Sequence, residues 1–166
     1  MFRSGLRIEE GNIWDFLLPP WNALVVVPTN IGWRKDGRNV MGRGLAFEAS
    51  RRFRGIADWY GGVCKLFREE TPVVRYYRAS VLLAPSKPLA SDPSLSWQQK
   101  ADLDLVARSL RQVGQWHQLT DWQGWIAVPF LGCGNGGLDP GDVWPIMVST
   151  LKDDRFVVIV KKGGIR

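Results

Sequence analysis

The sequence predicts an α/β fold: a three-layer α/β/α sandwich around a mixed, mostly parallel central sheet of about six strands. Apolar, strand-like segments alternate with amphipathic, helix-like segments along the chain. Two strand-like segments, residues 23–28 and 156–161, are apolar nearly throughout, which is typical of strands covered on both faces. With 166 residues and no repeat or long linker, the chain fits one domain over residues 1–166.

Each predicted element follows from a local pattern. Residues 44–53 predict a helix because Leu45, Ala46 and Ala49 lie on one side of it. Residues 97–116 give the strongest helical signal, with apolar residues at three- and four-residue steps. In chain order, we expect strands at 5–10 and 23–28, a helix at 44–53, one or two strands within 73–84, a helix at 97–116, a strand at 125–131, a helix at 140–151 and a strand at 156–161.

Composition narrows the class of protein. Apolar residues make up 45% and charged residues 23%, and neither a signal peptide nor a membrane span is evident, so we expect a cytoplasmic protein without membrane contact. Cys64 and Cys133 should be reduced, and with a single histidine, His117, they are too few for a zinc site. We expect no metal and no cofactor, and His117 should be a surface residue near a helix end. The net charge of +6 favours anionic partners.

The segment GCGNGG, residues 132–137, matches the spacing G-x-G-x-x-G between a predicted strand and a predicted helix. A dinucleotide-binding fold also needs an acidic residue about 20 positions on, at the end of the next strand. Here that strand, residues 156–161, is followed by Lys162 and glycines. The segment still suits a phosphate site, because backbone N–H groups can converge there and the helix behind adds its positive end. The alternative is a loop whose glycines merely need positive φ.

A second glycine-rich segment, residues 39–45 (NVMGRGL), leads directly into the helix predicted at 44–53. In parallel sheets, ligands bind beyond the carboxyl ends of the strands, where both glycine-rich loops are expected. The two loops would then hold a diphosphate from opposite sides.

These motifs together resemble the macrodomain family, which binds ADP-ribose. The resemblance covers most of the chain, and its last two motifs are most similar to the branch of terminal ADP-ribose glycohydrolases and DNA ADP-ribosyl glycohydrolase antitoxins. It rests on four stretches: GNI at 11–13, ALVVVPTN at 23–30, VMGRGLA at 40–46 and VPFLGCGNGGL at 128–138.

The resemblance implies roles for individual residues. Asn30 would bind the distal ribose, since a carboxamide both donates and accepts. Asn12 stands where many members carry an aspartate that accepts from the adenine amino group, and Ile13 would offer its backbone amide. The remaining ADP-ribose contacts implied are Val40, Met41, Gly42, Arg43, Gly44 and Leu45 in the first loop, and Leu131, Gly132, Cys133, Gly134, Asn135, Gly136, Gly137 and Leu138 in the second.

The same resemblance suggests Lys87 and Asn30 as catalytic residues. The segment at residues 84–88 (APSKP) resembles the segment that carries a catalytic lysine in the glycohydrolase branch. An amine could attack the anomeric carbon or the opened sugar aldehyde if burial or nearby positive charge keeps part of it unprotonated. The alternative is a solvated loop lysine. Residues 88–97 depart from the family pattern, and the longer loop could move Lys87 out of reach.

Gly136 bears on the substrate. Protein-directed members of the branch carry an acidic residue near this position, whereas DNA-directed members carry glycine, so the pattern favours ADP-ribose on a nucleic-acid base. We expect Asp139 to cap the following helix rather than to act as an acid or base.

The segment at residues 32–39 (GWRKDGRN) is a candidate for nucleic-acid contact. It combines three basic residues with a tryptophan, a composition that can bind phosphate and stack a base. A solvated loop with its tryptophan packed into the core is the alternative. The residues concerned are Trp33, Arg34, Lys35 and Arg38.

The predicted activity is removal of ADP-ribose from a modified macromolecule, with a DNA base as a candidate. Two alternatives remain open: a module that binds ADP-ribose without turnover, and an enzyme for a small derivative such as ADP-ribose 1″-phosphate or O-acetyl-ADP-ribose. The partners expected are ADP-ribose or an ADP-ribosylated substrate and DNA, and we expect a monomer.

Overall fold

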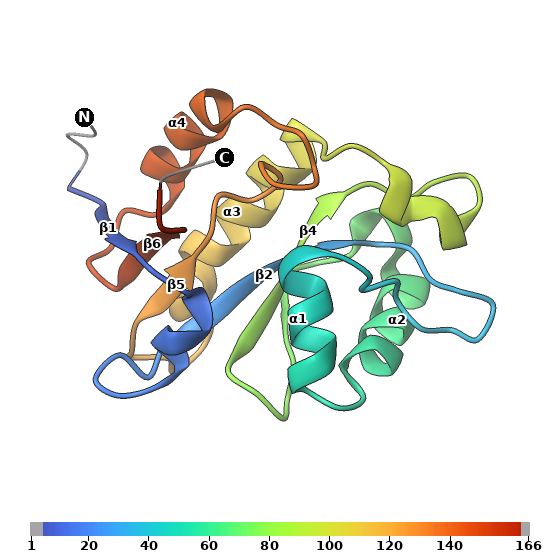
Figure 1. Cartoon of the computed structure of the whole chain (residues 1–166), viewed down its shortest axis with the longest axis horizontal. Coiled ribbons are helices and arrows are strands. Elements are labelled where there is room, and N and C mark those ends of the chain that lie inside the picture. The colour runs from blue at the N-terminus through green and yellow to red at the C-terminus, as the bar shows by residue number, and fades with distance from the viewer. Residues whose placement is uncertain (1–4, 164–166) are drawn as a thin grey trace.

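The computed structural model describes residues 5–163, which fold around a six-stranded sheet (Figure 1). The strand order is β1-β6-β5-β2-β4-β3, and every neighbouring pair is parallel except β3 and β4. This confirms the predicted mixed, mostly parallel sheet. The strands are β1 (Arg7–Glu10), β2 (Leu24–Asn30), β3 (Val74–Arg75), β4 (Val81–Lys87), β5 (Ile126–Val128) and β6 (Phe156–Val160).

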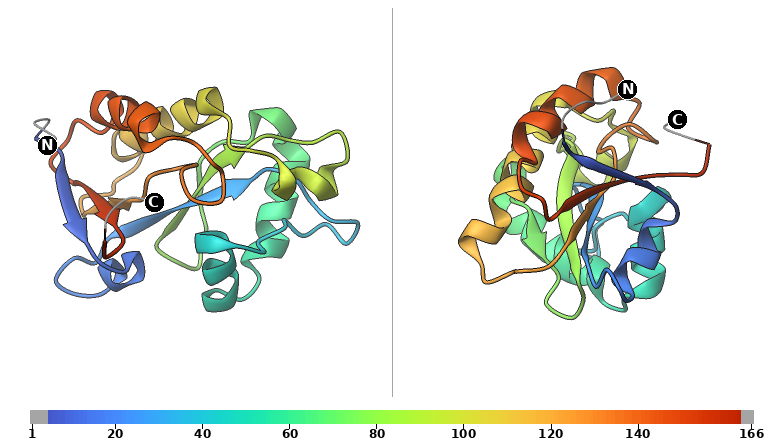
Figure 2. Two further views of the ribbon diagram at one scale, coloured as in Figure 1. Left: turned by 45° about the horizontal axis from the view of Figure 1, so that its top comes forward. Right: turned by 90° about the vertical axis from the view of Figure 1, so that its left-hand side faces the viewer.

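Helices cover both faces of the sheet, so the three-layer arrangement is also confirmed. The 3-10 helix η1 (Ile13–Leu17), α1 (Gly44–Arg52) and α2 (Ile56–Phe67) pack on one face, and α3 (Leu103–Leu119) and α4 (Pro140–Thr150) pack on the other. Figure 2 shows the sheet between these two layers. Two short 3-10 helices, η2 (Arg68–Glu70) and η3 (Pro93–Gln98), lie in the connections.

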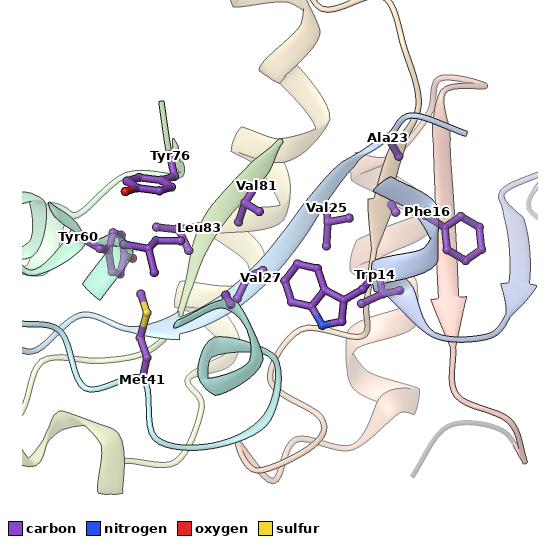
Figure 3. Packing of buried hydrophobic residues seen from close by; sticks show 14 of the residues in the cluster. Trp14, Phe16, Ala23, Val25, Val27, Met41, Tyr60, Tyr76, Val81 and Leu83 are labelled. Atoms are coloured by element: carbon purple, nitrogen blue, oxygen red, sulfur yellow. The ribbon is translucent and has the colours of Figure 1, made fainter. Parts of the chain in front are cut away.

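Two apolar cores form because strand side chains alternate between the faces. On β2, Val25 and Val27 point to the face where Trp14 and Tyr60 pack, as Figure 3 shows. Leu24 and its alternate neighbours belong to the second core, with residues of α3 and α4. Burial on both faces explains the continuous apolar run that predicted this strand.

Helix α2 was not predicted from the sequence. Gly61 and Gly62 interrupt its pattern, and glycine is unfavourable inside a helix. The structure supplies the reason for Gly61: a Cβ there would overlap the backbone oxygen of Gly37, and it would lie 2.7 Å from the amide nitrogen of Asn39. The helix therefore packs directly against the backbone of the loop that follows β2.

The helix predicted at residues 97–116 begins later than expected. Asp102 accepts a hydrogen bond from the Leu105 amide and caps α3, so Trp97 falls instead in η3. The strand predicted at 125–131 is also shorter, because the chain leaves the sheet after Val128. The remaining predicted elements agree with the structure within a few residues.

His117 is not the surface residue that we expected. Its side chain is 14% exposed, its ring lies 6.1 Å from that of Phe156, and its Nε2 is 3.6 Å from the carboxylate of Asp153. Both cysteines, Cys64 and Cys133, are buried and free. Over residues 5–163, no helix is both long and apolar enough to span a membrane.

Candidate functional site

A cavity of about 520 Å³ lies at the carboxyl ends of four adjacent strands, β6, β5, β2 and β4. This is where ligands bind in parallel sheets, and the volume is within the usual range for a small-molecule site. Both glycine-rich loops line it. The lining residues are Pro28, Thr29, Asn30, Val40, Gly42, Arg43, Gly44, Leu45, Ala46, Ser86, Lys87, Trp97, Pro129, Phe130, Gly132, Cys133, Gly134, Asn135, Gly136, Ile159, Val160, Lys161 and Lys162.

The loop after β5 lines this cavity and has backbone N–H groups without an acceptor. It closes on itself through the Leu138 amide, which donates to the Gly132 carbonyl, and Gly132 has a φ of +77°. Within the described residues, the amides of Gly134, Asn135 and Gly136 have no hydrogen-bond acceptor. Three successive amides without a partner at a cavity wall are suited to a phosphate.

The second glycine-rich loop faces the first. A Cβ on Gly44 would lie 3.2 Å from the side-chain nitrogen of Asn135, so the two loops are in contact. Gly44 has a φ of +58° and is the first residue of α1. The N-cap residue, Arg43, makes no hydrogen bond from its side chain to the first amides of the helix. The first amides of α1 are therefore available to an anion, together with the positive end of the helix dipole.

Helix α4 differs from α1 in this respect. Asp139 accepts a hydrogen bond from the Gly141 amide at 2.8 Å, which confirms the predicted cap. The negative charge of Asp139 offsets the positive end of α4. The helix end that can favour an anion in the cavity is thus that of α1, not the helix behind the GCGNGG loop as the sequence suggested.

Asn30 is held by a network that leaves little of its side chain free. Its Oδ1 accepts from the Gly32 amide at 3.0 Å and from Asn39 Nδ2 at 3.1 Å, and its Nδ2 donates to the Val40 carbonyl at 2.7 Å. These partners fix the orientation of the carboxamide, and one Nδ2 hydrogen remains. Asn30 thus shapes the loop and can donate one hydrogen bond into the cavity.

A β-bulge brings Lys87 beside Asn30. The register of β2 and β4 shifts by one residue after Thr29, so that Asn30 pairs with Lys87 and Ser86 is the extra residue. Because a shift of one residue reverses the face of every later side chain, the bulge places Lys87 on the side that Asn30 occupies. Ser86 is held in place by a hydrogen bond from its hydroxyl to the Thr29 carbonyl at 3.2 Å.

The Lys87 ammonium lies in an environment that disfavours its charge. Burial lowers the pKa of Lys87, and the nearby guanidinium of Arg43 lowers it further. Lys87 Nζ donates a hydrogen bond to the Trp97 carbonyl at 2.9 Å. The longer loop at residues 88–97 therefore folds back over the lysine and does not move it out of the cavity.

The cavity is positively charged. Its lining includes four cationic side chains, and among the described residues that line it there is no carboxylate. The cations stand at both ends: Arg43 and Lys87 near β2 and β4, and Lys161 and Lys162 after β6. Such a surface favours a ligand with several negative charges.

Several residues predicted to bind ADP-ribose do not line the cavity. The Asn12 side chain instead accepts from the Trp14 amide at 3.1 Å and caps η1. Ile13, Met41 and Leu131 are buried in the two cores. Gly137 and Leu138 close the loop from behind, where the Leu138 side chain packs near Gly132.

The segment predicted to contact nucleic acid lies outside the cavity lining. Trp33 packs against the core and Arg68 lies over its ring at 5.3 Å, which agrees with the alternative of a tryptophan packed inward. Arg38 pairs with Asp58 at 3.0 Å, whereas Arg34 and Lys35 are exposed.

Trp97, Phe130 and the lysine pair after β6 also line the cavity, although no site role was predicted for them from the sequence. The lysine pair had a usable signal, since it follows a predicted buried strand at the binding edge of the sheet. Trp97 had none, because it was assigned to a helix.

The structure gives Gly136 a steric role. A Cβ there would lie 2.5 Å from the Gly132 carbonyl oxygen and 2.7 Å from the Ala101 Cβ. Any side chain at this position would force the loop open. Packing therefore explains glycine at position 136 without reference to the substrate.

The sequence matches no family model and no curated protein, but the structure has clear relatives. The DarG macrodomain of Thermus aquaticus superposes with a TM-score of 0.70 at 24% identity, over 93% of this chain and 96% of the other. The chain has the macrodomain fold. The DarG macrodomain of Mycobacterium tuberculosis is 27% identical, with a TM-score of 0.67 over 93% of this chain and 97% of the other.

A third relative is Thermosipho africanus DarTG, whose structure was solved in complex with ADP-ribose. It is 23% identical with a TM-score of 0.70, and the match covers 93% of this chain and 40% of the longer DarTG chain. The resemblance to macrodomains that was inferred from the motifs is thus confirmed, and the solved structures that it matches include DarG macrodomains.

Proposed function

We propose that the macrodomain binds ADP-ribose in the cavity and removes it from a modified DNA base. The observation that carries the proposal is the pairing of Lys87 and Asn30 at one end of a cationic cavity whose middle is walled by two glycine-rich loops. The ADP-ribose complex of DarTG and the likeness to DarG support it.

The free amides of Gly134, Asn135 and Gly136 and the uncapped start of α1 would hold the diphosphate from two sides. Lysines 161 and 162 would add positive charge at the end of β6. Asn30 would donate its remaining hydrogen to a hydroxyl of the distal ribose. This arrangement needs no movement of the loops, since both already face the cavity.

Lys87 would act on the distal ribose. Its lowered pKa increases the fraction of neutral amine at a given pH, and a neutral amine can attack the anomeric carbon. The bond from that carbon to the base breaks as the bond to nitrogen forms; the electron pair leaves with the base, which takes up the proton that the lysine nitrogen loses. Water then adds to the same carbon, its bond to the lysine nitrogen breaks, and ADP-ribose and the free amine are released.

The test compares hydrolysis of an ADP-ribosylated DNA oligonucleotide and an ADP-ribosylated protein by the wild type, Lys87→Ala and Lys100→Ala. Lys100 is an exposed lysine outside the cavity lining and serves as the matched control. We expect hydrolysis of the oligonucleotide, its loss in Lys87→Ala with ADP-ribose binding retained, and no change in Lys100→Ala. Full activity of Lys87→Ala would refute the role of Lys87.

Binding without turnover is the second candidate function. It is favoured by the hydrogen bond that occupies Lys87 Nζ and by the lack of a carboxylate in the described lining. Heat on titration with ADP-ribose, with no hydrolysis of either macromolecule, would establish it. ADP-ribose 1″-phosphate and O-acetyl-ADP-ribose belong in the same assay. We also propose that the protein is a monomer, which sedimentation would test.

A further inference from the structure

Trp97 occupies a distinctive place in the cavity. It lies in η3, within the long connection from β4 to α3, and its partly exposed side chain lines the wall next to Lys87. The contact with Lys87 is made by the backbone carbonyl of Trp97. The indole ring is therefore not needed to hold the lysine and is available for another role.

The ring is held in position by a cation. The guanidinium carbon of Arg43 lies 5.6 Å from the centroid of the indole ring, which is a cation–π distance. Arg43 and Trp97 come from different loops, so this contact joins the wall formed after β2 to that formed after β4. The result is an aromatic ring with a guanidinium over one of its faces.

The order of the strands indicates which end of a ligand would meet this surface. The cavity crosses the ends of β6, β5, β2 and β4 in that order, with the lysine pair at the β6 end and Trp97 beside the β4 end. The diphosphate loop follows β5, between these ends. If Asn30 binds the distal ribose, the group attached to that ribose leaves the cavity beside Trp97.

We propose that the Trp97 indole stacks on the nucleobase that carries ADP-ribose and so determines specificity for a modified base. This inference rests on the proposed function and names the part of the substrate that lies outside ADP-ribose itself. An aromatic ring stacks on any base, and the charge of Arg43 suits the phosphates that flank a base in a DNA strand.

The experiment measures two affinities for each variant: that for free ADP-ribose and that for an ADP-ribosylated DNA oligonucleotide. All proteins carry Lys87→Ala, so that the oligonucleotide persists during the titration. Stacking on one base contributes about 1–3 kcal/mol, so Trp97→Leu should weaken the affinity for the modified oligonucleotide by roughly 5- to 150-fold. The affinity for free ADP-ribose should stay unchanged.

Two further variants sharpen the result. Trp97→Phe keeps an aromatic face and should restore most of the affinity for the oligonucleotide. Trp33→Leu removes a tryptophan outside the cavity lining and should alter neither affinity.

Three outcomes would overturn the inference. Equal weakening for both ligands would mean that the ring contacts ADP-ribose itself, and no weakening would mean that it contacts neither. Equal weakening for an ADP-ribosylated peptide would remove the assignment to a base. Failure of the proposed function gives different results: either the protein with Trp97 intact binds no ADP-ribose, or the protein with Lys87 intact binds ADP-ribose but does not hydrolyse the modified oligonucleotide.

Discussion

The packing at Gly136 permits a sharp test with a matched control in the same loop. In Gly136→Ala, the new Cβ would lie 2.5 Å from the Gly132 oxygen and 2.7 Å from the Ala101 Cβ. In Gly134→Ala, no heavy atom lies within 4 Å of the new Cβ. Neither glycine has a positive φ, so the two substitutions differ in the space available and not in backbone strain.

The cost of Gly136→Ala follows from these distances. Carbon atoms pack at about 3.5–4.0 Å, so the loop must open by about 1 Å on the side of Ala101. Overpacking of this kind typically costs about 1–3 kcal/mol. Opening the loop also redirects the amides of residues 134–136, so the affinity for ADP-ribose should fall as well.

Urea unfolding measures the difference. With a slope of about 2 kcal/mol per molar urea, a loss of about 2 kcal/mol lowers the midpoint by about 1 M. Gly134→Ala should leave the midpoint unchanged or raise it slightly, because alanine restricts the unfolded chain. Equal midpoints for the two variants would show that the loop accommodates a Cβ at Gly136, and glycine there would then be left without a steric explanation.

Three further predictions concern the cavity. Asn30→Ala leaves the Gly32 amide and the Val40 carbonyl without their partner, and it should lower the free energy of unfolding by about 1–3 kcal/mol, measured by urea titration. If neutral Lys87 is the nucleophile, the rate at saturating substrate should rise with pH to a plateau, with an apparent pKa below that of an ordinary lysine. Arg43→Gln should raise this pKa because it removes a neighbouring cation. Burial and, next, the carboxylate of Asp139 raise the pKa of Cys133 to about 11. Iodoacetamide near neutral pH should therefore alkylate Cys133 much more slowly than a free thiol, and more slowly still when ADP-ribose is bound. Mass spectrometry measures the extent of alkylation over time.

The sequence predicted those parts of the fold whose pattern depends on the element itself. Residues 23–28 and 156–161 are apolar because both of their faces are covered, and that requirement is visible in any such strand. Helix α2 is different, because glycine at position 61 is required by close contact with the backbone of another segment and not by the helix itself. A local pattern cannot report a contact with a loop more than 20 residues away.

In the site, too, the features set by local composition could be predicted, and those set by tertiary contacts could not. The two glycine-rich loops were found from their composition, and the structure brings them into contact. The bulge at Ser86 has no sequence signal, because it depends on how β4 pairs with β2. Trp97 was placed in the helix predicted at residues 97–116, whereas the cap at Asp102 starts α3 only at Leu103. In both cases tertiary contacts override a local preference.

The charge of the cavity limits the chemistry that it can support. A general acid or base would usually be a carboxylate or a histidine, and neither is found among the described residues that line the cavity. A base or nucleophile must then come from another side chain of the lining. Lys87 is the lining residue whose pKa is lowered and which lies beside Asn30. The proposed hydrolysis would thus depend on one amine and on the electrostatic stabilisation that the backbone amides and cations provide, so the loss of Lys87 should remove turnover while leaving the affinity for ADP-ribose intact.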